Sequence, residues 1–155
     1  ACGLEHTIVL LADGTVRTFG RSNNGQLGIN VSGAGQSRLT PVQVLNITSA
    51  TAVAGGDSHT AVLLADGTVR TFGLNTNGQL GVNDTTSRQT PVQVFGISSS
   101  ATAIACGGDH TAVLLADGTV RTFGQNSSGQ LGVNDTTSRL TPVQVFGISS
   151  SAVAV

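Results

Sequence analysis

The stretch that decides the fold runs from His59 to Gly73 and reads HTAVLLADGTVRTFG. Two apolar runs flank Asp66-Gly67, and an Asp-Gly pair between apolar runs is typical of a tight two-residue β-hairpin turn. The same stretch recurs from His6 and from His110, with an Ile replacing one Ala in the first copy. The starting points lie 53 and 51 residues apart, which indicates a tandem repeat.

Two further motifs keep this spacing, so the repeat extends over the whole chain. Each copy continues with Gly-Gln-Leu-Gly and then Thr-Pro-Val-Gln-Val, which begin at Gly25, Gly78, Gly129, Thr40, Thr90 and Thr141. The chain therefore divides into repeats 1–53, 54–104 and 105–155. The first repeat carries a loop insertion near 31–36, and this insertion has no charged residue.

Each repeat contains four short segments with the pattern of β-strands and none with the 3.6-residue period of a helix. In the second repeat we expect strands at 59–64, 68–72, 91–95 and 101–105. Pro91 would begin the third strand, where its missing amide donor does least harm. The small residues of 101–105 suit the strand nearest a narrow axis. Four short strands in about fifty residues are typical of a propeller blade, so we predict an all-β fold of three four-stranded blades.

The composition argues against two classes of partner. Charged residues make up 10% of the chain, against about a quarter in an ordinary soluble domain. A net charge of −1 and seven scattered Arg residues form no basic stripe, so we expect no nucleic-acid partner. The uncharged apolar runs are too short to cross a bilayer, so we expect no membrane span.

Several motifs recur together in all three copies, and in the third they are Cys106-Gly107, His110-Thr111, Asp117-Gly118, Phe123-Gly124, Gln125-Asn126, Gly129-Gln130-Leu131-Gly132 and Pro142-Val143. This combination resembles the regulator of chromosome condensation repeat family. The resemblance implies blades of four antiparallel strands, usually seven in a closed ring. It also implies two kinds of activity, because the founding member is a nucleotide exchange factor for a small nuclear GTPase, whereas other members serve only as interaction scaffolds.

The chain departs from the family pattern at two positions of each repeat. Phe19, Phe72 and Phe123 stand where the family often has Trp. A Gly of the family is replaced by Asn in every copy, at Asn30, Asn83 and Asn134. Asn tolerates the left-handed backbone conformation, so we expect this turn to be kept.

One His and one Asp recur in every repeat, at His6, His59, His110, Asp13, Asp66 and Asp117. A catalytic or metal site needs several groups in one pocket, whereas one group per blade is spread around an arc. We therefore interpret these residues as structural. Each His should hydrogen-bond the turn between strands of its own blade, and each Asp should shape its Asp-Gly turn. We expect no catalytic residue, metal or cofactor, and hence no enzyme.

Cysteine and arginine residues also recur at equivalent positions. Cys2 and Cys106 lie two blades apart, too far for a disulfide within the chain, so we expect small buried thiols near the axis; a disulfide between chains is the alternative. One strand position carries an arginine in each repeat, at Arg17, Arg70 and Arg121. Without interleaved aromatic residues, we interpret this series as a solvated ladder of charge.

Asn30, Asn83 and Asn134 each satisfy the Asn-x-Ser/Thr rule at one loop position of the repeat. We therefore expect them to be the modified residues if a glycosylating cell secretes the protein. The chain has no Lys and is rich in Thr, Ser and Asn, which suits an extracellular or cell-surface protein. A cytoplasmic location is the alternative.

The last four residues, Ala152, Val153, Ala154 and Val155, align with 101–104, which lead directly into the third repeat. This register predicts that 152–155 pair as a strand with a blade beginning at Ala1, from another copy or from further blades of a longer chain. Two chains could close a six-bladed ring, or many could add head to tail as a filament, because such contacts need not close. Unpaired strand edges are otherwise liable to aggregate.

These observations favour a non-enzymatic β-propeller scaffold that self-assembles, outside the cell or at its surface. The alternative is an intracellular propeller that binds a protein partner, including the exchange-factor role that the family resemblance implies. Blade-specific charged loops would favour the alternative.

Overall fold

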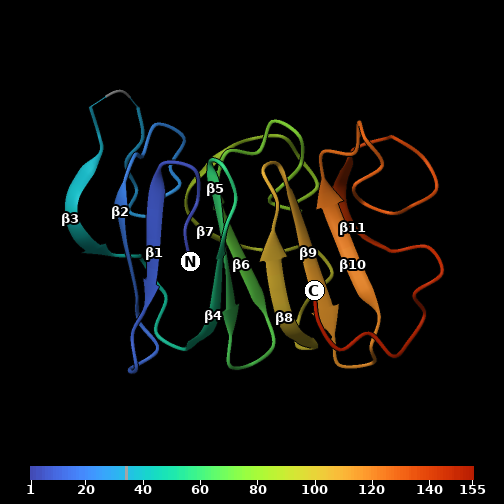
Figure 1. The fold of residues 1–155 in the computed structure, drawn as a ribbon. Coiled ribbons are helices and arrows are strands. Elements are labelled where there is room, and N and C mark those ends of the chain that lie inside the picture. Colours follow the sequence, from blue (N-terminus) through green and yellow to red (C-terminus); the bar gives the residue numbers. More distant parts are fainter. Residues whose placement is uncertain (34) are drawn as a thin grey trace.

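The computed structural model describes residues 1–33 and 35–155, and these residues contain eleven strands and no helix. The all-β class is therefore confirmed, with the strands arranged in three antiparallel sheets placed side by side (Figure 1). In chain order the strands are β1 (His6–Leu10), β2 (Val16–Gly20), β3 (Arg38–Gln43), β4 (Ala50–Gly55), β5 (His59–Leu64), β6 (Val69–Gly73), β7 (Arg88–Gln93), β8 (Ala101–Cys106), β9 (His110–Leu115), β10 (Val120–Gly124) and β11 (Arg139–Gln144).

Each sheet is one blade. Blade one has the order β1-β2-β3, blade two β4-β5-β6-β7 and blade three β8-β9-β10-β11. Blades two and three have the predicted four strands. Blade one has three, because only Ala1 and Cys2 represent its inner strand: Cys2 bridges Thr7, and Ala1 exchanges backbone hydrogen bonds with Ile8. These pairs match Gly55 with Thr60 in blade two, so the register is the same.

The sequence repeat and the blade are offset by one strand. The boundaries at 53/54 and 104/105 fall inside β4 and β8, so each repeat ends with the inner strand of the following blade. These inner strands contact each other across the blades, and β4 also contacts β1. The small side chains of β4 and β8 allow this close approach. The predicted insertion near 31–36 includes residue 34, which lies outside the described residues.

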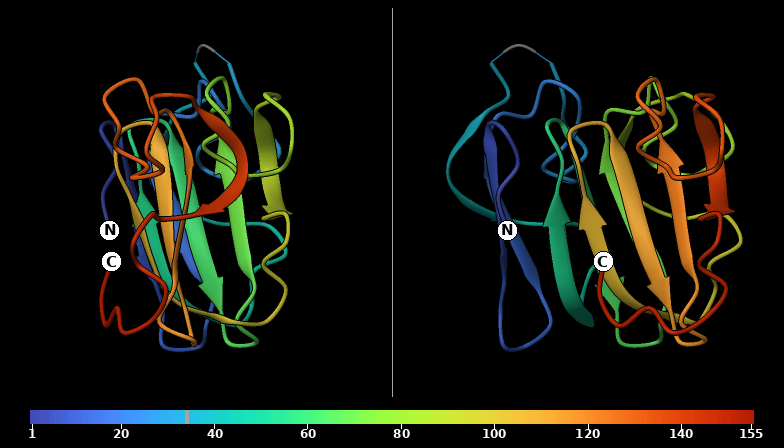
Figure 2. Two further views of the ribbon diagram at one scale, coloured as in Figure 1. Left: turned by 90° about the vertical axis from the view of Figure 1, so that its right-hand side faces the viewer. Right: turned by 45° about the vertical axis from the view of Figure 1, so that its right-hand side comes forward.

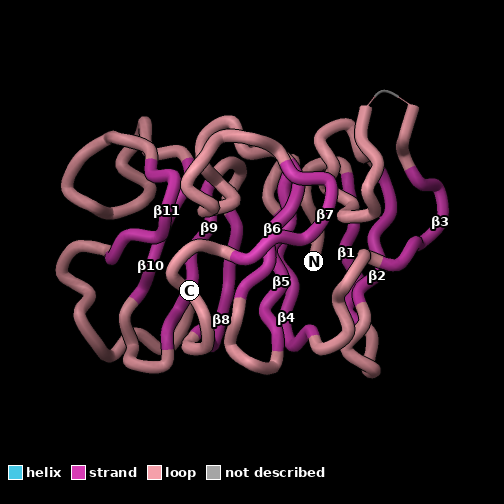
Figure 3. Tube along the Cα trace, turned by 180° about the vertical axis from the view of Figure 1, so that it is seen from behind, coloured by secondary structure: helices cyan, strands magenta, loops and turns pink. Residues whose placement is uncertain are grey.

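The outer strands β3, β7 and β11 differ from the prediction; Figure 3 shows them from behind. We expected 91–95 with Pro91 first, but β7 begins at Arg88 and Pro91 is its fourth residue. The pairing shifts between Thr71 and Gly73, so Arg88 pairs with Gly73 and Val92 with Thr71. Pro91 lies within this irregularity of an edge strand, where it removes no regular ladder hydrogen bond.

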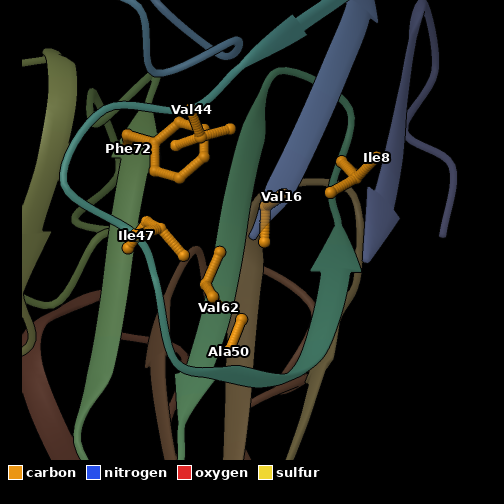
Figure 4. Close-up of a cluster of buried hydrophobic side chains, with 7 residues drawn as sticks. All are labelled: Ile8, Val16, Val44, Ile47, Ala50, Val62 and Phe72. Carbon is orange, nitrogen blue, oxygen red and sulfur yellow. The ribbon is translucent and has the colours of Figure 1, made fainter. Parts of the chain in front are cut away.

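The hydrophobic cores lie between the blades. One cluster joins residues of blade one with residues of blade two: Ile8, Val16, Val44 and Ile47 pack against Ala50, Val62 and Phe72 (Figure 4). A second, equivalent cluster joins blades two and three: Leu63, Val69, Val94 and Ile97 pack against Ala101, Val113 and Phe123. Viewed along the row, the sheets overlap face to face (Figure 2, left), so each blade is covered by its neighbour.

The three equivalent Phe residues allow a matched test of this packing. Phe123 is fully buried between blades two and three, whereas Phe19, in blade one, is only partly buried. We predict that Phe123→Ala lowers the free energy of unfolding by about 3–5 kcal/mol, because a large cavity forms in the interface. Phe19→Ala should cost less than half as much. Urea denaturation measures both changes, and equal losses would contradict the interface assignment.

Candidate functional site

The recurring His residues join neighbouring blades. His6 Nε2 lies 2.9 Å from Thr60 Oγ1, and His59 Nε2 lies 2.9 Å from Thr111 Oγ1. Each pair links the first residue of one hairpin with the second residue of the equivalent hairpin in the next blade. The prediction that each His bonds within its own blade is therefore wrong. The repeat spacing does not reveal which neighbour a side chain faces, and these rings face the following blade.

The hydrogen bonds also fix the position of the ring proton. Thr111 Oγ1 donates to the carbonyl oxygen of Gln79, and Thr60 Oγ1 donates to that of Gln26, each at 2.9 Å. Because each hydroxyl has one proton to donate, it accepts from the His ring, so Nε2 of His59 carries a proton. The buried Nδ1 atoms of both bonded His rings have no hydrogen-bond partner.

A glycine lies directly against each of the three His rings. A Cβ atom added to Gly56 would lie 2.1 Å from His59 Cε1 and 2.3 Å from its Nδ1. Equivalent clashes would arise at Gly3 and Gly107. No larger residue fits there without moving the ring, so this glycine is part of the blade interface.

Burial keeps these rings neutral. Desolvation lowers the pKa of His6 to about 4 and that of His59 to about 3, where the neighbouring His6 and His110 add a smaller effect in the same direction. The pKa of His110 is also lowered by burial, and Asp109 opposes that effect. A neutral imidazole with a proton on Nε2 suits a hydrogen bond to a hydroxyl.

The other repeated polar residues act within their turns. Asp66 Oδ1 accepts hydrogen bonds from the backbone N–H and the hydroxyl of Thr68, and Asp13 and Asp117 make the same pair of bonds to their own Thr. The Thr68 hydroxyl is the main cause of the lowered pKa of Asp66. Each carboxylate therefore stabilises its own Asp-Gly turn through Oδ1.

The loop Asn residues adopt the backbone conformation expected of them. Asn30, Asn83 and Asn134 have φ values of 61°, 64° and 63°, in the left-handed region. All three are exposed, whereas Asn126, which also satisfies the Asn-x-Ser/Thr rule, is fully buried. The backbone N–H of Asn83 donates to Leu140 of the next blade. This loop position thus contributes to the interface through its backbone while its side chain faces solvent.

The cysteines are free and differ in exposure. Burial raises the pKa of Cys106 to about 12 despite hydrogen bonds from Thr111 and the Ala61 backbone. Cys2 is exposed and Cys106 is partly buried, so the expectation of two buried thiols is wrong, most clearly for Cys2. Its blade contains too little of the inner strand to enclose it.

One hydrogen bond between blades could not be predicted from the recurring motifs, because its acceptor does not recur. Gln79 Nε2 donates to Asp109 Oδ1 of blade three at 2.9 Å. Ser58 occupies the place of Asp109 in blade two, and the equivalent Gln26 Nε2 is buried without a partner. The two interfaces therefore share the His–Thr bond but differ in this polar contact.

The two ends of the row expose the side chains that the internal interfaces bury. Ile148 is 37% exposed, whereas its equivalent Ile97 is 2% exposed. At the other end Val9 is 37% exposed, whereas the equivalent Val62 is fully buried. Among the described residues, no hydroxyl bonds the ring of His110. The two surfaces are named here the trailing face (His110, Val145, Ile148) and the leading face (Thr7, Val9, Phe19), and their residues are equivalent to those that pack together between blades inside the chain.

Residues 1–33 and 35–155 hold neither a clustered metal site nor a membrane-spanning helix. No group of three or more His, Cys, Asp or Glu side chains among them is placed to hold a metal ion. Within the same residues, no helix has the length and apolar character required to cross a membrane.

Three blades of antiparallel strands with interblade cores define a β-propeller repeat protein. The family model "Regulator of chromosome condensation (RCC1) repeat" matches residues 13–63, 66–114 and 117–155. This match covers most of the chain, and the chain belongs to the RCC1 repeat family. The resemblance drawn from the sequence motifs is confirmed.

Relatives of known name share these repeats within longer chains. The chain is 36% identical over 154 residues to human "Probable E3 ubiquitin-protein ligase HERC3", and it covers 15% of that protein. It is 32% identical over 157 residues to the "Ultraviolet-B receptor UVR8" of Arabidopsis thaliana, of which it covers 35%. In both alignments 99% of this chain is matched. The chain thus spans well under half the length of these relatives.

Solved structures agree on the fold. Prp20p from Saccharomyces cerevisiae superimposes with a TM-score of 0.82 at 17% identity, over 94% of this chain and 37% of that one. Prp20p itself is described as having binding properties to Gsp1p and histones. At this identity the likeness concerns the fold, and it agrees with the arrangement of blades described above.

The buried neutral His residues predict acid sensitivity. As the pH falls below 6.5 the unfolded chain takes up protons on its His residues, whereas folded His6 and His59 stay neutral until about pH 4 and 3. The free energy of unfolding should therefore be fully present above pH 6.5 and decrease between pH 6.5 and 4. For fully buried His59 the slope should approach about 1.4 kcal/mol per pH unit.

Urea denaturation across this pH range measures the slope. His59→Gln should reduce the slope, because the substituted side chain does not titrate. The turn carboxylates, whose pKa values are lowered, contribute mainly below pH 4. An unfolding free energy that stays constant from pH 6.5 to 4.5 would show that these rings are not buried in the neutral form.

Proposed function

We propose that this chain is a non-enzymatic interaction scaffold that works inside the cell by binding protein partners through its blades. This proposal rests on the observation that the repeated polar side chains serve the structure. The bonded His, Thr and Asp side chains are engaged in blade stacking or turns, which leaves the loops and the groove between blades two and three for recognition. Repeat proteins of this type commonly present extended binding surfaces.

The comparisons support the intracellular reading over the extracellular one. The first relatives are named as ubiquitin-protein ligases, and ubiquitin ligation is an intracellular process. The chain covers only 14–15% of these relatives, so their ligase activity is not transferred to it. Nucleotide exchange would rest on a fold likeness at 17% identity. Glycosylation of Asn30, Asn83 and Asn134 stays a prediction for a secreted form.

Self-assembly is a second candidate, and the complementary end faces favour it. The trailing face offers the His110 ring and Ile148, and the leading face of a second copy offers Thr7 and Phe19. Inside the chain, the residues equivalent to His110 and Ile148 contact the residues equivalent to Thr7 and Phe19. Residues 152–155 would also complete the inner strand of blade one. They form no strand within a single chain, although Ala152 N–H donates to Gly118 as Ala101 N–H does to Gly67.

Molar mass in solution, measured by light scattering after size exclusion, tests this assembly. We predict a multiple of the 15.5 kDa chain mass for the natural sequence. Ile148→Asp should shift the mass to that of the monomer, because it places a charge in an apolar interface. Deleting residues 152–155 should do the same by removing the donated strand.

Thr76→Asp is the matched control, because Thr76 is exposed in the middle blade, where both neighbouring blades are in place. It should leave the mass unchanged. A monomeric natural chain at its highest soluble concentration would overturn self-assembly. It would leave the binding of other proteins as the function.

A further inference from the structure

A groove opens between blades two and three on the side of the outer strands. Its volume is about 230 Å³, and it is lined by Phe95, Gly96, Ile97, Leu115, Arg121, Thr141 and Pro142. The first three residues follow β7 of blade two, and the others belong to blade three. The groove is thus a product of blade stacking and does not exist in either blade alone.

The walls of this groove are largely apolar and accessible. Phe95 is 59% exposed, which is unusual for an aromatic side chain in a chain with few aromatics. Ile97 is 2% exposed and belongs to the interblade core. Leu115 and Pro142 are half-buried on the opposite side. An apolar side chain of a partner would therefore meet apolar surface on both walls.

Arg121 is the only charged residue that lines the groove. It alternates along β10 with Val120 and Thr122, so it points to the same side as Phe123, which is buried against blade two. Within residues 1–33 and 35–155, ion pairs are formed by Arg21, Arg88 and Arg139, and no hydrogen bond engages the guanidinium of Arg121. A half-buried guanidinium with free donors is well suited to bind a carboxylate.

We infer that this groove binds an extended acidic peptide segment of a partner protein, in which a carboxylate stands next to an apolar side chain. The apolar side chain would pack against Phe95 and Pro142, and the carboxylate would accept hydrogen bonds from Arg121. The charge of the groove selects an acidic occupant over a basic one. Augmentation of the outer strand is a poorer mode, because Pro142 interrupts the donors of β11. This inference rests on the proposed scaffold function and names the partner chemistry.

The same position recurs between blades one and two. The equivalent residues there are Leu45, Asn46, Ile47, Leu64, Arg70, Thr90 and Pro91. Leu45 is 40% exposed and Arg70 is half-buried. Leu45 and Asn46 replace Phe95 and Gly96, so this position offers less aromatic surface. A partner with two such segments could contact both positions and gain avidity.

The test uses the full chain and a fluorescein-labelled peptide, Ser-Glu-Glu-Leu-Phe-Glu-Glu-Ser, titrated by fluorescence anisotropy. Counterparts with Gln or Lys in place of every Glu measure the role of charge. The acidic peptide should bind at least about tenfold more tightly than the Gln peptide, and the Lys peptide should bind most weakly. Arg121→Gln and Phe95→Ser should each weaken binding of the acidic peptide about tenfold.

Arg88→Gln is the matched control, because it removes the same charge from a side chain that is paired with Asp84 outside the groove. It should change the affinity by less than about twofold. Equal binding of the three peptides, or equal weakening by Arg88→Gln and Arg121→Gln, would overturn the inference. The inference would also be overturned if the natural chain bound no peptide and Arg121→Gln reduced the assembled mass. A second copy of the chain would then occupy the groove.

The two proposals fail separately. A monomeric chain that binds the acidic peptide through Arg121 would overturn self-assembly and support the groove. An assembled chain that binds none of the three peptides would overturn the groove and leave assembly standing.

Discussion

Each blade of this protein has two apolar faces, and only a neighbouring blade can bury them. The cores consist of side chains from two blades, with Phe72 and Phe123 each fully enclosed by the blade before them. Burial of apolar area is the main favourable contribution to folding, so the stability of any one blade depends on its neighbours. The architecture follows from this dependence, since blades must stack in register.

Polar contacts give this stacking its specificity. The His59–Thr111 hydrogen bond and the Thr111–Gln79 bond connect buried residues of different blades. Such buried bonds require one relative position of the two sheets, because displacement would leave buried polar atoms without partners. The interface between blades two and three also forms the groove at the outer strands. Structure and recognition surface therefore have a common origin in the contact between blades.

The repeat, the hairpins and the propeller class could be predicted from the sequence, because the Asp-Gly turns and alternating strands are local signals. The hydrogen-bond partner of His59 could not be predicted, because the equal spacing of the repeats fits a bond within one blade as well as a bond between two blades. The start of β7 at Arg88 was missed because the pairing irregularity opposite Phe72 has no local signature. The exposure of Cys2 follows from the short inner strand of blade one, and the groove at Arg121 depends on how two blades pack together; the repeat pattern specifies neither.

The most direct test of blade-to-blade dependence is a double-mutant cycle on His59 and Thr111, measured by urea denaturation above pH 7. His59→Ala, Thr111→Ala and the double variant give the coupling free energy between the blades. If the bond joins the blades, the coupling should be about 1 kcal/mol, while the pair His59 and Thr68 within one blade should be additive. Additive effects at His59 and Thr111, within about 0.3 kcal/mol, would contradict an interlock between the blades.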